Sequence, residues 1–368
     1  MYLNNSKQVV IKIGSSLLIN DKKKIRKKWL LDFSKDIEDL IKNKKKVIIV
    51  SSGAIALGCK KLKLNKKNIK LDKSQAVASI GQIELMNLFK KTFNSKKINL
   101  SQILITLEDT EQRRRAINAK RTFDNLFNLG FVPVVNENDS IATSEIKYGD
   151  NDRLASRVAQ ISGADCLILL SDVNGLYTKN PKIHKNAKLI KKINNIDFNI
   201  EKIATKSVAS YGTGGMRTKI EAGKICQLSG CYMSIANGLI LRPIQNINKN
   251  NSCTWIVPKI SKLDARKKWI ISSVSPKGEL ILDDGAINAL KKGKSLLAAG
   301  IKKINGKFNK GDHIKILDKN MKEYARGLSS FTSIEIEKIK GQHSSKINEL
   351  LGYITKSEVV HKDDMVEI

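Results

Sequence analysis

The chain has 368 residues, 41% of them hydrophobic, and a formal net charge of +32 at pH 7. This length exceeds the size at which a single core usually stops growing, so we expect two domains. Its apolar runs, such as 47–50 and 166–170, are too short to cross a bilayer. Because the first residues do not resemble a secretory signal, we expect a cytoplasmic protein without a membrane partner.

Predicted strands and helices alternate through the first half of the chain. Apolar residues at helical spacing predict a helix over 26–43, between buried strands at 8–13 and 47–50. The alternation predicts an α/β domain whose mainly parallel sheet is sandwiched by helices. The remaining predicted strands are 102–106, 131–135 and 167–170, and the remaining helices are 74–93, 110–129 and 152–162.

The pattern changes after about residue 257, where a polar and basic segment, 258–271, reads as a linker. Shorter apolar runs follow, and glycines at turn-like intervals separate them, which predicts a small β-rich barrel or sandwich. We therefore expect one domain at 1–257 and a second at 272–368. The short predicted strands are 269–274, 279–282, 296–298, 313–317 and 325–328.

The cysteines and histidines do not form the spacings of a metal site. The five cysteines include no Cys-x-x-Cys pair, which favours buried reduced thiols. The four histidines are widely separated along the chain, so we predict no structural zinc and assign no residue as a metal ligand.

The high positive charge raises the question of a nucleic-acid partner. From residue 268 onward the chain has 18 Lys and Arg against 13 Asp and Glu, so almost all of the excess lies before that point. There it is mostly lysine, spread through many segments beside Asn and Ile. This distribution favours solvated faces over a dedicated patch, and nucleic acid is not expected as a partner.

Polar clusters follow four of the predicted strands. Lys12 precedes a Gly-Ser-Ser turn, Ser52 follows the second strand, and Asn136 and Asp139 follow the strand at 131–135. Ser171 and Asp172 end the strand at 167–170. An open α/β sheet binds ligands beyond the carboxyl ends of its strands, so we expect these side chains at one edge.

Two further segments carry glycines beside charged residues. Residues 212–219 hold three glycines and two threonines before Lys219, which suits a phosphate cradle at a helix start, although a flexible surface turn is the alternative. In residues 149–152, helix capping accounts for only one of three consecutive polar side chains. The others need a partner.

Known nucleotide-binding fingerprints are missing from the first strand-to-helix turn. The pattern Gly-x-Gly-x-x-Gly is absent there, which disfavours a nicotinamide enzyme, and a near P-loop fails because Cys59 stands where lysine is required. Two lysines far apart in sequence, glycine N–H donors and several carboxylates instead suit phosphoryl transfer, where catalysis depends on positioning and charge neutralisation.

Taken in order, these motifs resemble those of the glutamate kinases of the amino acid kinase family, and the tail resembles a PUA domain. The resemblance spans nearly the whole chain and rests on residues 10–16, 52–58, 134–139, 149–152, 172–178, 212–219 and 352–365.

The resemblance implies transfer of the ATP γ-phosphate to the side-chain carboxylate of L-glutamate, which gives L-glutamyl 5-phosphate for proline biosynthesis. It implies catalytic roles for Lys12, Lys219 and Asp150, with Asp150 orienting the lysines or the substrate ammonium, and glutamate binding by Ser52, Asn136, Asp139 and Asn151. It implies ATP binding by Lys12, Ser171, Asp172, Thr213, Gly214, Gly215, Met216, Arg217, Thr218 and Lys219.

The expected cofactor is Mg²⁺, which enters with ATP as co-substrate. The expected partners are L-glutamate and ATP, functional coupling to glutamyl phosphate reductase, and further copies of the chain in a dimer or tetramer. Three alternatives stay open: a sibling kinase with another acceptor, an RNA-binding protein that uses the tail, and an inactive scaffold.

Overall fold

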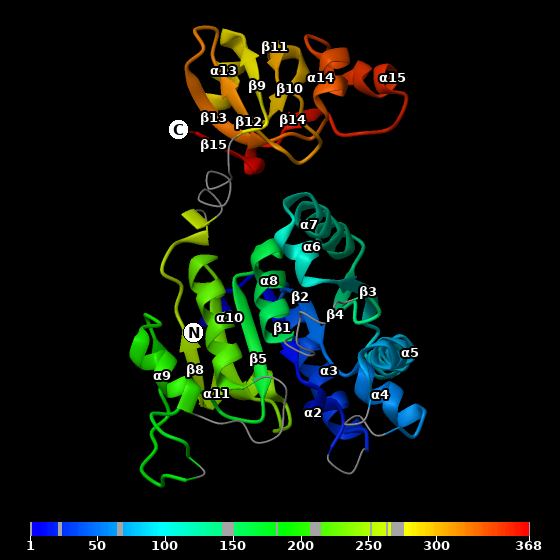
Figure 1. The fold of residues 1–368 in the computed structure, drawn as a ribbon, viewed down its shortest axis with the longest axis vertical. Helices are drawn as coiled ribbons and strands as arrows, with labels where there is room; N and C mark the ends of the chain where they lie inside the picture. The colour runs from blue at the N-terminus through cyan, green and yellow to red at the C-terminus, as the bar shows by residue number, and fades with distance from the viewer. Residues whose placement is uncertain are drawn as a thin grey trace. The chain divides into compact units, whose positions relative to one another are not determined.

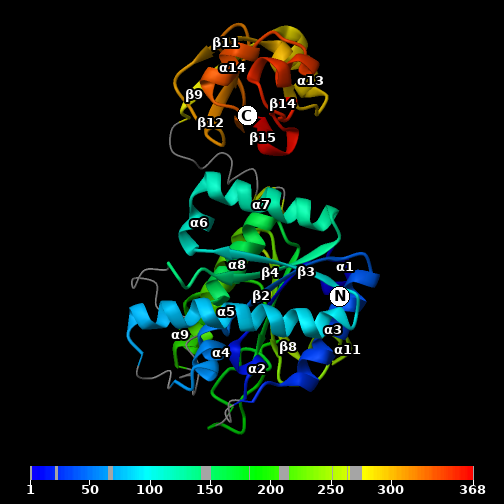
Figure 2. The ribbon, with the colours of Figure 1, turned by 90° about the vertical axis from the view of Figure 1, so that its right-hand side faces the viewer.

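The computed structural model describes residues 2–20, 24–64, 69–141, 151–181, 183–206, 215–250, 252–262, 264–265 and 276–367 (Figures 1 and 2). The chain divides into two compact units, Met1–Lys262 and Leu263–Ile368. This division falls inside the segment predicted to be a linker. The expected domain limits, 1–257 and 272–368, stay predictions.

An eight-stranded sheet forms the centre of the N-terminal unit, in the order β3-β4-β2-β1-β5-β7-β8-β6. Only the β7–β8 pairing is antiparallel, so the predicted mainly parallel sheet is confirmed. The strands are β1 (Gln8–Ile13), β2 (Lys46–Ser51), β3 (Asn99–Ile105), β4 (Phe131–Glu137), β5 (Cys166–Ser171), β6 (Lys192–Ile193), β7 (Tyr232–Asn237) and β8 (Cys253–Ile256).

Helices cover both faces of this sheet. In Figure 2, β3 and β4 lie between α7 on one side and α5 on the other. One face packs against α3 (Lys27–Lys42), α5 (Leu71–Asn94) and α11 (Pro243–Asn250). The other packs against α6 (Leu107–Glu111), α7 (Arg113–Asn128), α8 (Asn151–Ser162), α9 (Phe198–Lys206) and α10 (Met216–Leu228). Shorter helices are α1 (Tyr2–Asn5), α2 (Ser15–Leu18) and α4 (Ala54–Lys61).

The helix predicted at 110–129 differs from the structure. Thr106 caps α6 with a capping box, in which its side chain accepts from the backbone N–H of Asp109. Gln112 then has extended backbone angles, φ −73° and ψ 113°, and separates α6 from α7. The capping signal at Thr106 was visible in the sequence and places a helix start earlier than the apolar spacing did.

The alternation of side chains along β1 assigns each residue to one face. Val9, Ile11 and Ile13 pack in the core that contains α3 and α5. Val10 packs in the opposite core, against α8 and α10. Lys12 has the same parity as Val10, so its side chain leaves the sheet on the face of α8 and α10.

The C-terminal unit has its own core and is β-rich, as predicted. A five-stranded sheet in the order β11-β9-β12-β13-β15 is accompanied by a two-stranded sheet, β10-β14. Its strands are β9 (Gly278–Leu282), β10 (Leu296–Leu297), β11 (Ile301–Asn305), β12 (His313–Leu317), β13 (Glu323–Leu328), β14 (Glu358–Val360) and β15 (Met365–Glu367), and its helices are α13 (Asp284–Lys291), α14 (Ser333–Ile339) and α15 (Ile347–Leu351). The strand predicted at 269–274 lies outside the described residues.

All five cysteines are buried and free of disulfides, as the spacing suggested. Burial raises the pKa of the Cys166 and Cys253 thiols, so both stay protonated at neutral pH. Within the described ranges, the structure contains no helix long and apolar enough to cross a membrane.

Candidate phosphoryl-transfer site

Two lysines from distant parts of the chain meet at one aspartate. Lys12 Nζ lies 2.7 Å from Asp152 Oδ1, and Lys219 Nζ lies 2.9 Å from Asp152 Oδ2. The exposed fractions of Lys12, Asp152 and Lys219 are 8%, 1% and 6%. We call these three side chains the two-lysine centre. It carries one net positive charge in a buried place, and such a charge is costly unless an anion compensates it.

The fold explains why these three side chains meet. Lys12 lies on β1, in register with Val50 of β2 and Leu169 of β5, and points to the face covered by α8 and α10. Asp152 is the second residue of α8, and Lys219 lies in the first turn of α10, which packs against α8. The starts of both helices therefore lie over the carboxyl end of the central strand.

The electrostatics of the centre fix the charge of Asp152. Burial raises the pKa of the Asp152 carboxyl, but the charges and hydrogen bonds of Lys12 and Lys219 outweigh burial and hold that pKa well below its usual range. Asp152 is therefore ionised at neutral pH. It separates two ammonium groups that would otherwise repel each other.

The start of α10 adds a hydroxyl to this centre. The Thr218 hydroxyl lies 2.9 Å from the carbonyl oxygen of Gly215 and 3.3 Å from Asp152 Oδ2. Met216 is half-buried and Arg217 is exposed, where it pairs with Glu221. Of the expected ATP-binding residues, Gly215 to Lys219 are described and lie at or next to the two-lysine centre.

The turn after β2 lies beside the turn after β1. The Ser52 backbone N–H and its hydroxyl both donate to the carbonyl oxygen of Ile13, at 3.1 Å each. Gly53 follows with φ +120°, a conformation that strongly favours glycine, and α4 begins directly after it. A Cβ at Gly14 would lie 3.8 Å from Lys12 Nζ, so the first turn runs next to that ammonium.

Two of the expected glutamate-binding residues are hydrogen-bonded to each other. Asn151, the first residue of α8, donates from Nδ2 to Asn136 Oδ1 at 3.0 Å, and both are 2% exposed. Asn136 lies near the end of β4. Asp139 is half-buried in the turn that follows.

The end of β5 brings the last expected pair to this edge of the sheet. Ser171 is in register with Asn237 of β7, and its hydroxyl lies 3.1 Å from Oδ1 of the exposed Asp172. Because β5 neighbours β1, both residues lie at the same edge as the turn after Lys12.

Three expected site residues lie outside the described residues: Asp150, Thr213 and Gly214. Their assignments stay predictions. The aspartate that contacts both lysines is Asp152, which was not among the expected site residues. The signal was present, because Asp152 belonged to a run of polar residues at a helix start that capping alone did not explain.

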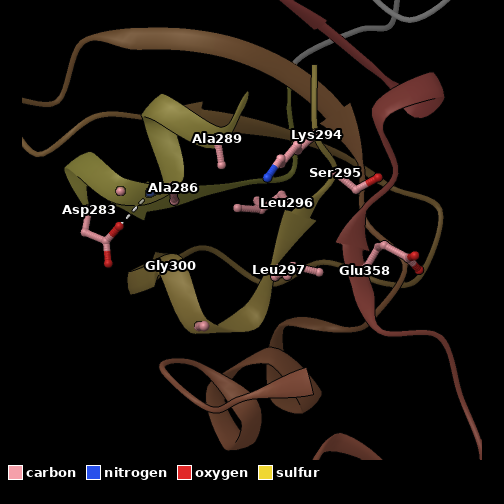
Figure 3. Close-up of a pocket in the computed structure, with 11 residues that line it drawn as sticks. Asp283, Ala286, Ala289, Lys294, Ser295, Leu296, Leu297, Gly300 and Glu358 are labelled. Atoms are coloured by element: carbon pink, nitrogen blue, oxygen red, sulfur yellow. Dashed lines mark hydrogen bonds between the residues drawn. The ribbon is translucent and has the colours of Figure 1, made fainter. Parts of the chain in front are cut away.

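A separate pocket of about 440 Å³ occurs in the C-terminal unit (Figure 3). It lies among α13, β10 and β14. Its charged lining residues are one lysine, Lys294, and two carboxylates, Asp283 and Glu358. This balance does not favour a phosphate backbone.

Comparison with known proteins identifies both units. Residues 7–237 match the amino acid kinase family and residues 278–351 match the PUA domain. The chain belongs to the amino acid kinase family. The predicted resemblance is thereby confirmed for both units, and the amino acid kinase unit is the one that contains the two-lysine centre.

Relatives of this amino acid kinase carry a specific name. A protein named glutamate 5-kinase from Pelagibacter ubique (strain HTCC1062) is 77% identical over 100% of both chains. Another of that name from Nitrobacter hamburgensis is 44% identical over 100% of this chain and 97% of its own. The structure of carbamate kinase from Giardia lamblia bound to AMP-PNP has a TM-score of 0.50 and 16% identity, and covers 70% of this chain and 100% of its own. That likeness concerns the fold alone.

Proposed function

We propose that this chain transfers the γ-phosphoryl group of ATP to the side-chain carboxylate of L-glutamate, which gives L-glutamyl 5-phosphate. The observation that carries the proposal is the two-lysine centre, with its buried net positive charge at the carboxyl edge of the sheet. The full-length relatives named glutamate 5-kinase support glutamate as the acceptor. The product belongs to proline biosynthesis.

The acceptor needs no general base. A carboxylate is already anionic at neutral pH, whereas an alcohol acceptor would need to lose a proton. The obstacle is instead repulsion between two anions, the glutamate carboxylate and the phosphates of ATP. Lys12 and Lys219 supply positive charge where these anions meet, and that charge becomes more valuable as negative charge develops on the transferring group.

Asp152 keeps the two ammonium groups in place before substrates bind. Its two oxygens take one lysine each, so the lysines hold a fixed separation without a bound anion. Fixed charges need not reorganise during the reaction, which is the source of their catalytic effect. Asp150, outside the described residues, stays a second candidate for orienting the lysines or the substrate ammonium.

The glutamate side of the site is proposed at Ser52, Asn136, Asp139 and Asn151, and the ATP side at Ser171, Asp172 and residues 213–219. The described members of this set come from the ends of β4 and β5, from the turns after β2, β4 and β5, and from the starts of α8 and α10. In this proposal the lysines act between the two sides, where the reacting groups would meet.

Mg²⁺ is proposed to enter with ATP. Each oxygen of Asp152 is paired with a lysine, so we do not propose this carboxylate as a metal ligand. The described residues contain no group of three or more His, Cys, Asp or Glu that could hold one. Magnesium bound mainly by ATP phosphates and water would neutralise phosphate charge.

The test is glutamate-dependent release of ADP by the purified full chain with Mg-ATP. We expect activity with L-glutamate and none with carbamate or aspartate. Phosphorylation of another acceptor, with glutamate inert, would assign the chain to a sibling of the amino acid kinase family. Location in the cytoplasm, a dimer or tetramer, and coupling to glutamyl phosphate reductase are part of the same proposal.

A further inference from the structure

A row of three buried carboxamides runs from the two-lysine centre into the core. Asn151 Nδ2 donates to Asn136 Oδ1 at 3.0 Å, and Asn136 Nδ2 donates to Gln82 Oε1 at 2.9 Å. Gln82 is 8% exposed. We call Gln82, Asn136 and Asn151 the carboxamide relay. Gln82 was not among the expected site residues, and it lies on α5 rather than after a strand.

The carboxamide relay crosses the carboxyl edge of the sheet. Asn136 has the same parity on β4 as Val132 and Val134, which pack in the core that contains α5. Asn151 begins α8, whose apolar side chains pack in the core of the opposite face. The two hydrogen bonds therefore connect α8 on one face with α5 on the other.

The depth of α5 is set by a close contact with α4. A Cβ at Gly81 would lie 1.8 Å from the carbonyl oxygen of Ala54, and one at Gly58 would lie 2.1 Å from that of Val77. Glycine at both positions lets the two helix backbones touch. Because Ala54 follows the Ser52-Gly53 turn, this contact fixes Gln82, the neighbour of Gly81, relative to the proposed glutamate site.

The direction of the hydrogen bonds determines what Asn151 offers a ligand. A carboxamide has one donor end and one acceptor end. Since Asn151 uses its Nδ2 on Asn136, its Oδ1 is the acceptor end left for a ligand. Because Gln82 Oε1 accepts from Asn136 Nδ2, it keeps Asn136 Oδ1 turned toward Asn151.

Gln82 also has an incompletely satisfied side chain. Its Nε2 is buried and has no hydrogen-bond partner in the part of the chain that the structure describes. Buried amide donors are nearly always paired, so an unpaired one at this position is unfavourable for stability. Leucine or methionine would fill this place on α5 without leaving a donor unpaired.

We propose that Gln82 is a positioning residue for the amino-acid substrate. It fixes Asn136 and, through Asn136, turns Asn151 Oδ1 toward the α-ammonium group of the substrate, which can only donate hydrogen bonds. This inference rests on the proposed function, because it assigns a group of glutamate to the relay. In this role Gln82 acts through Asn136.

The experiment compares Gln82→Met, which keeps the volume and removes the acceptor, with Gln82→Glu, which keeps an acceptor for Asn136. We expect Gln82→Met to raise the KM for glutamate about 10-fold, with the KM for ATP within about twofold of wild type, because one buried hydrogen bond is lost on the glutamate side. The KM of Gln82→Glu for glutamate should be closer to that of wild type.

The matched control is Thr92→Val on the same helix. Thr92 is 9% exposed, and its hydroxyl donates only to the carbonyl oxygen of Leu88 within α5. Thermal unfolding without ligands should be similar in Thr92→Val and Gln82→Met. An equal rise of the glutamate KM in both variants would assign the effect to helix stability and overturn the proposal.

A second experiment uses glutarate as an inhibitor, because it keeps both carboxylates of glutamate and lacks the ammonium group. Its inhibition constant should not change in Gln82→Met, and a parallel rise would overturn the role of the ammonium. A wild-type chain without glutamate-dependent ADP release would contradict the proposed function. An active wild type with an unchanged Gln82→Met variant would contradict only the positioning role.

Discussion

The two-lysine centre and the carboxamide relay are neighbours, since Asp152 and Asn151 are consecutive residues of α8. They differ in the kind of interaction that holds each together. The centre consists of full charges, two cations on one anion. The relay consists of neutral dipoles in a row. Loss of one partner in the centre leaves a buried charge uncompensated, whereas loss of one partner in the relay frees an amide to turn. The site thus separates a part that stabilises charge from a part that sets orientation.

The largest effect is expected from Lys219→Ala, which removes one charge from the transferring group. The expected loss of kcat is about 1000-fold or more, or ~4 kcal/mol of transition-state stabilisation. The matched control is Lys224→Ala on the same helix, because Lys224 is half-buried and paired with Glu201 rather than with Asp152. Steady-state ADP release measures both, and equal kcat values for the two variants would contradict the catalytic role of Lys219.

Asp152→Asn should lower the stability of the protein as well as its activity. The two lysines would remain buried without their anion, which is expected to cost about 3 kcal/mol of the free energy of unfolding. Because folding lowers the pKa of Asp152, its stabilisation is complete above the unfolded value of about 3.9 and is lost as pH falls through the lower folded value.

The stability difference between wild type and Asp152→Asn should therefore be constant between about pH 6 and about pH 8. Urea unfolding at several pH values measures it. A difference that shrinks within that range would mean that Asp152 titrates there, against the expected direction of its pKa shift.

Gly81→Ala tests the support of the carboxamide relay without replacing any of its three side chains. The new methyl group would meet the carbonyl oxygen of Ala54, so α5 must move, at an expected cost of about 2 kcal/mol. The glutamate KM should rise with little change in the ATP KM. Ser79→Ala, an exposed position of α5, is the control. Unchanged stability in Gly81→Ala would show that the two helices can separate freely.

The smallest effect is expected from Asn136→Ala, which interrupts the relay in its middle. Both hydrogen bonds are lost, and the glutamate KM should rise about 10-fold or somewhat more, while kcat falls far less than in Lys219→Ala. Glutamate titration at saturating ATP measures this. A kcat loss as large as that of Lys219→Ala would contradict the assignment of charge stabilisation to the two-lysine centre and of orientation to the relay.

Much of the N-terminal unit could be predicted from periodicity. The alternation of strands and long helices through residue 171 follows from apolar spacing, although the short α4 and the break between α6 and α7 do not, and the carboxyl-edge rule points to Lys12, Ser52 and Ser171. Lys12 stood out because a lysine between two isoleucines has no ordinary place in a buried strand.

Asp152 and Gln82 were not predicted because their importance lies in pairing across the fold. Asp152 has the appearance of a helix-start acid, and nothing local shows that two lysines, 140 and 67 residues away in the numbering, converge on it. Gln82 lies inside a long helix, where a glutamine normally faces solvent. Its burial depends on the two glycines that bring α4 and α5 together.

The two-lysine centre also sets a condition on the order in which the protein matures. Lys12 is made early and lies in the middle of the sheet, but Lys219 is added only after more than half of the chain has been synthesised. Domains fold largely as units during synthesis, so the two-lysine centre cannot form until Lys219 has been synthesised. The chain can therefore become active only late in its synthesis, when nearly all of its first domain has been made.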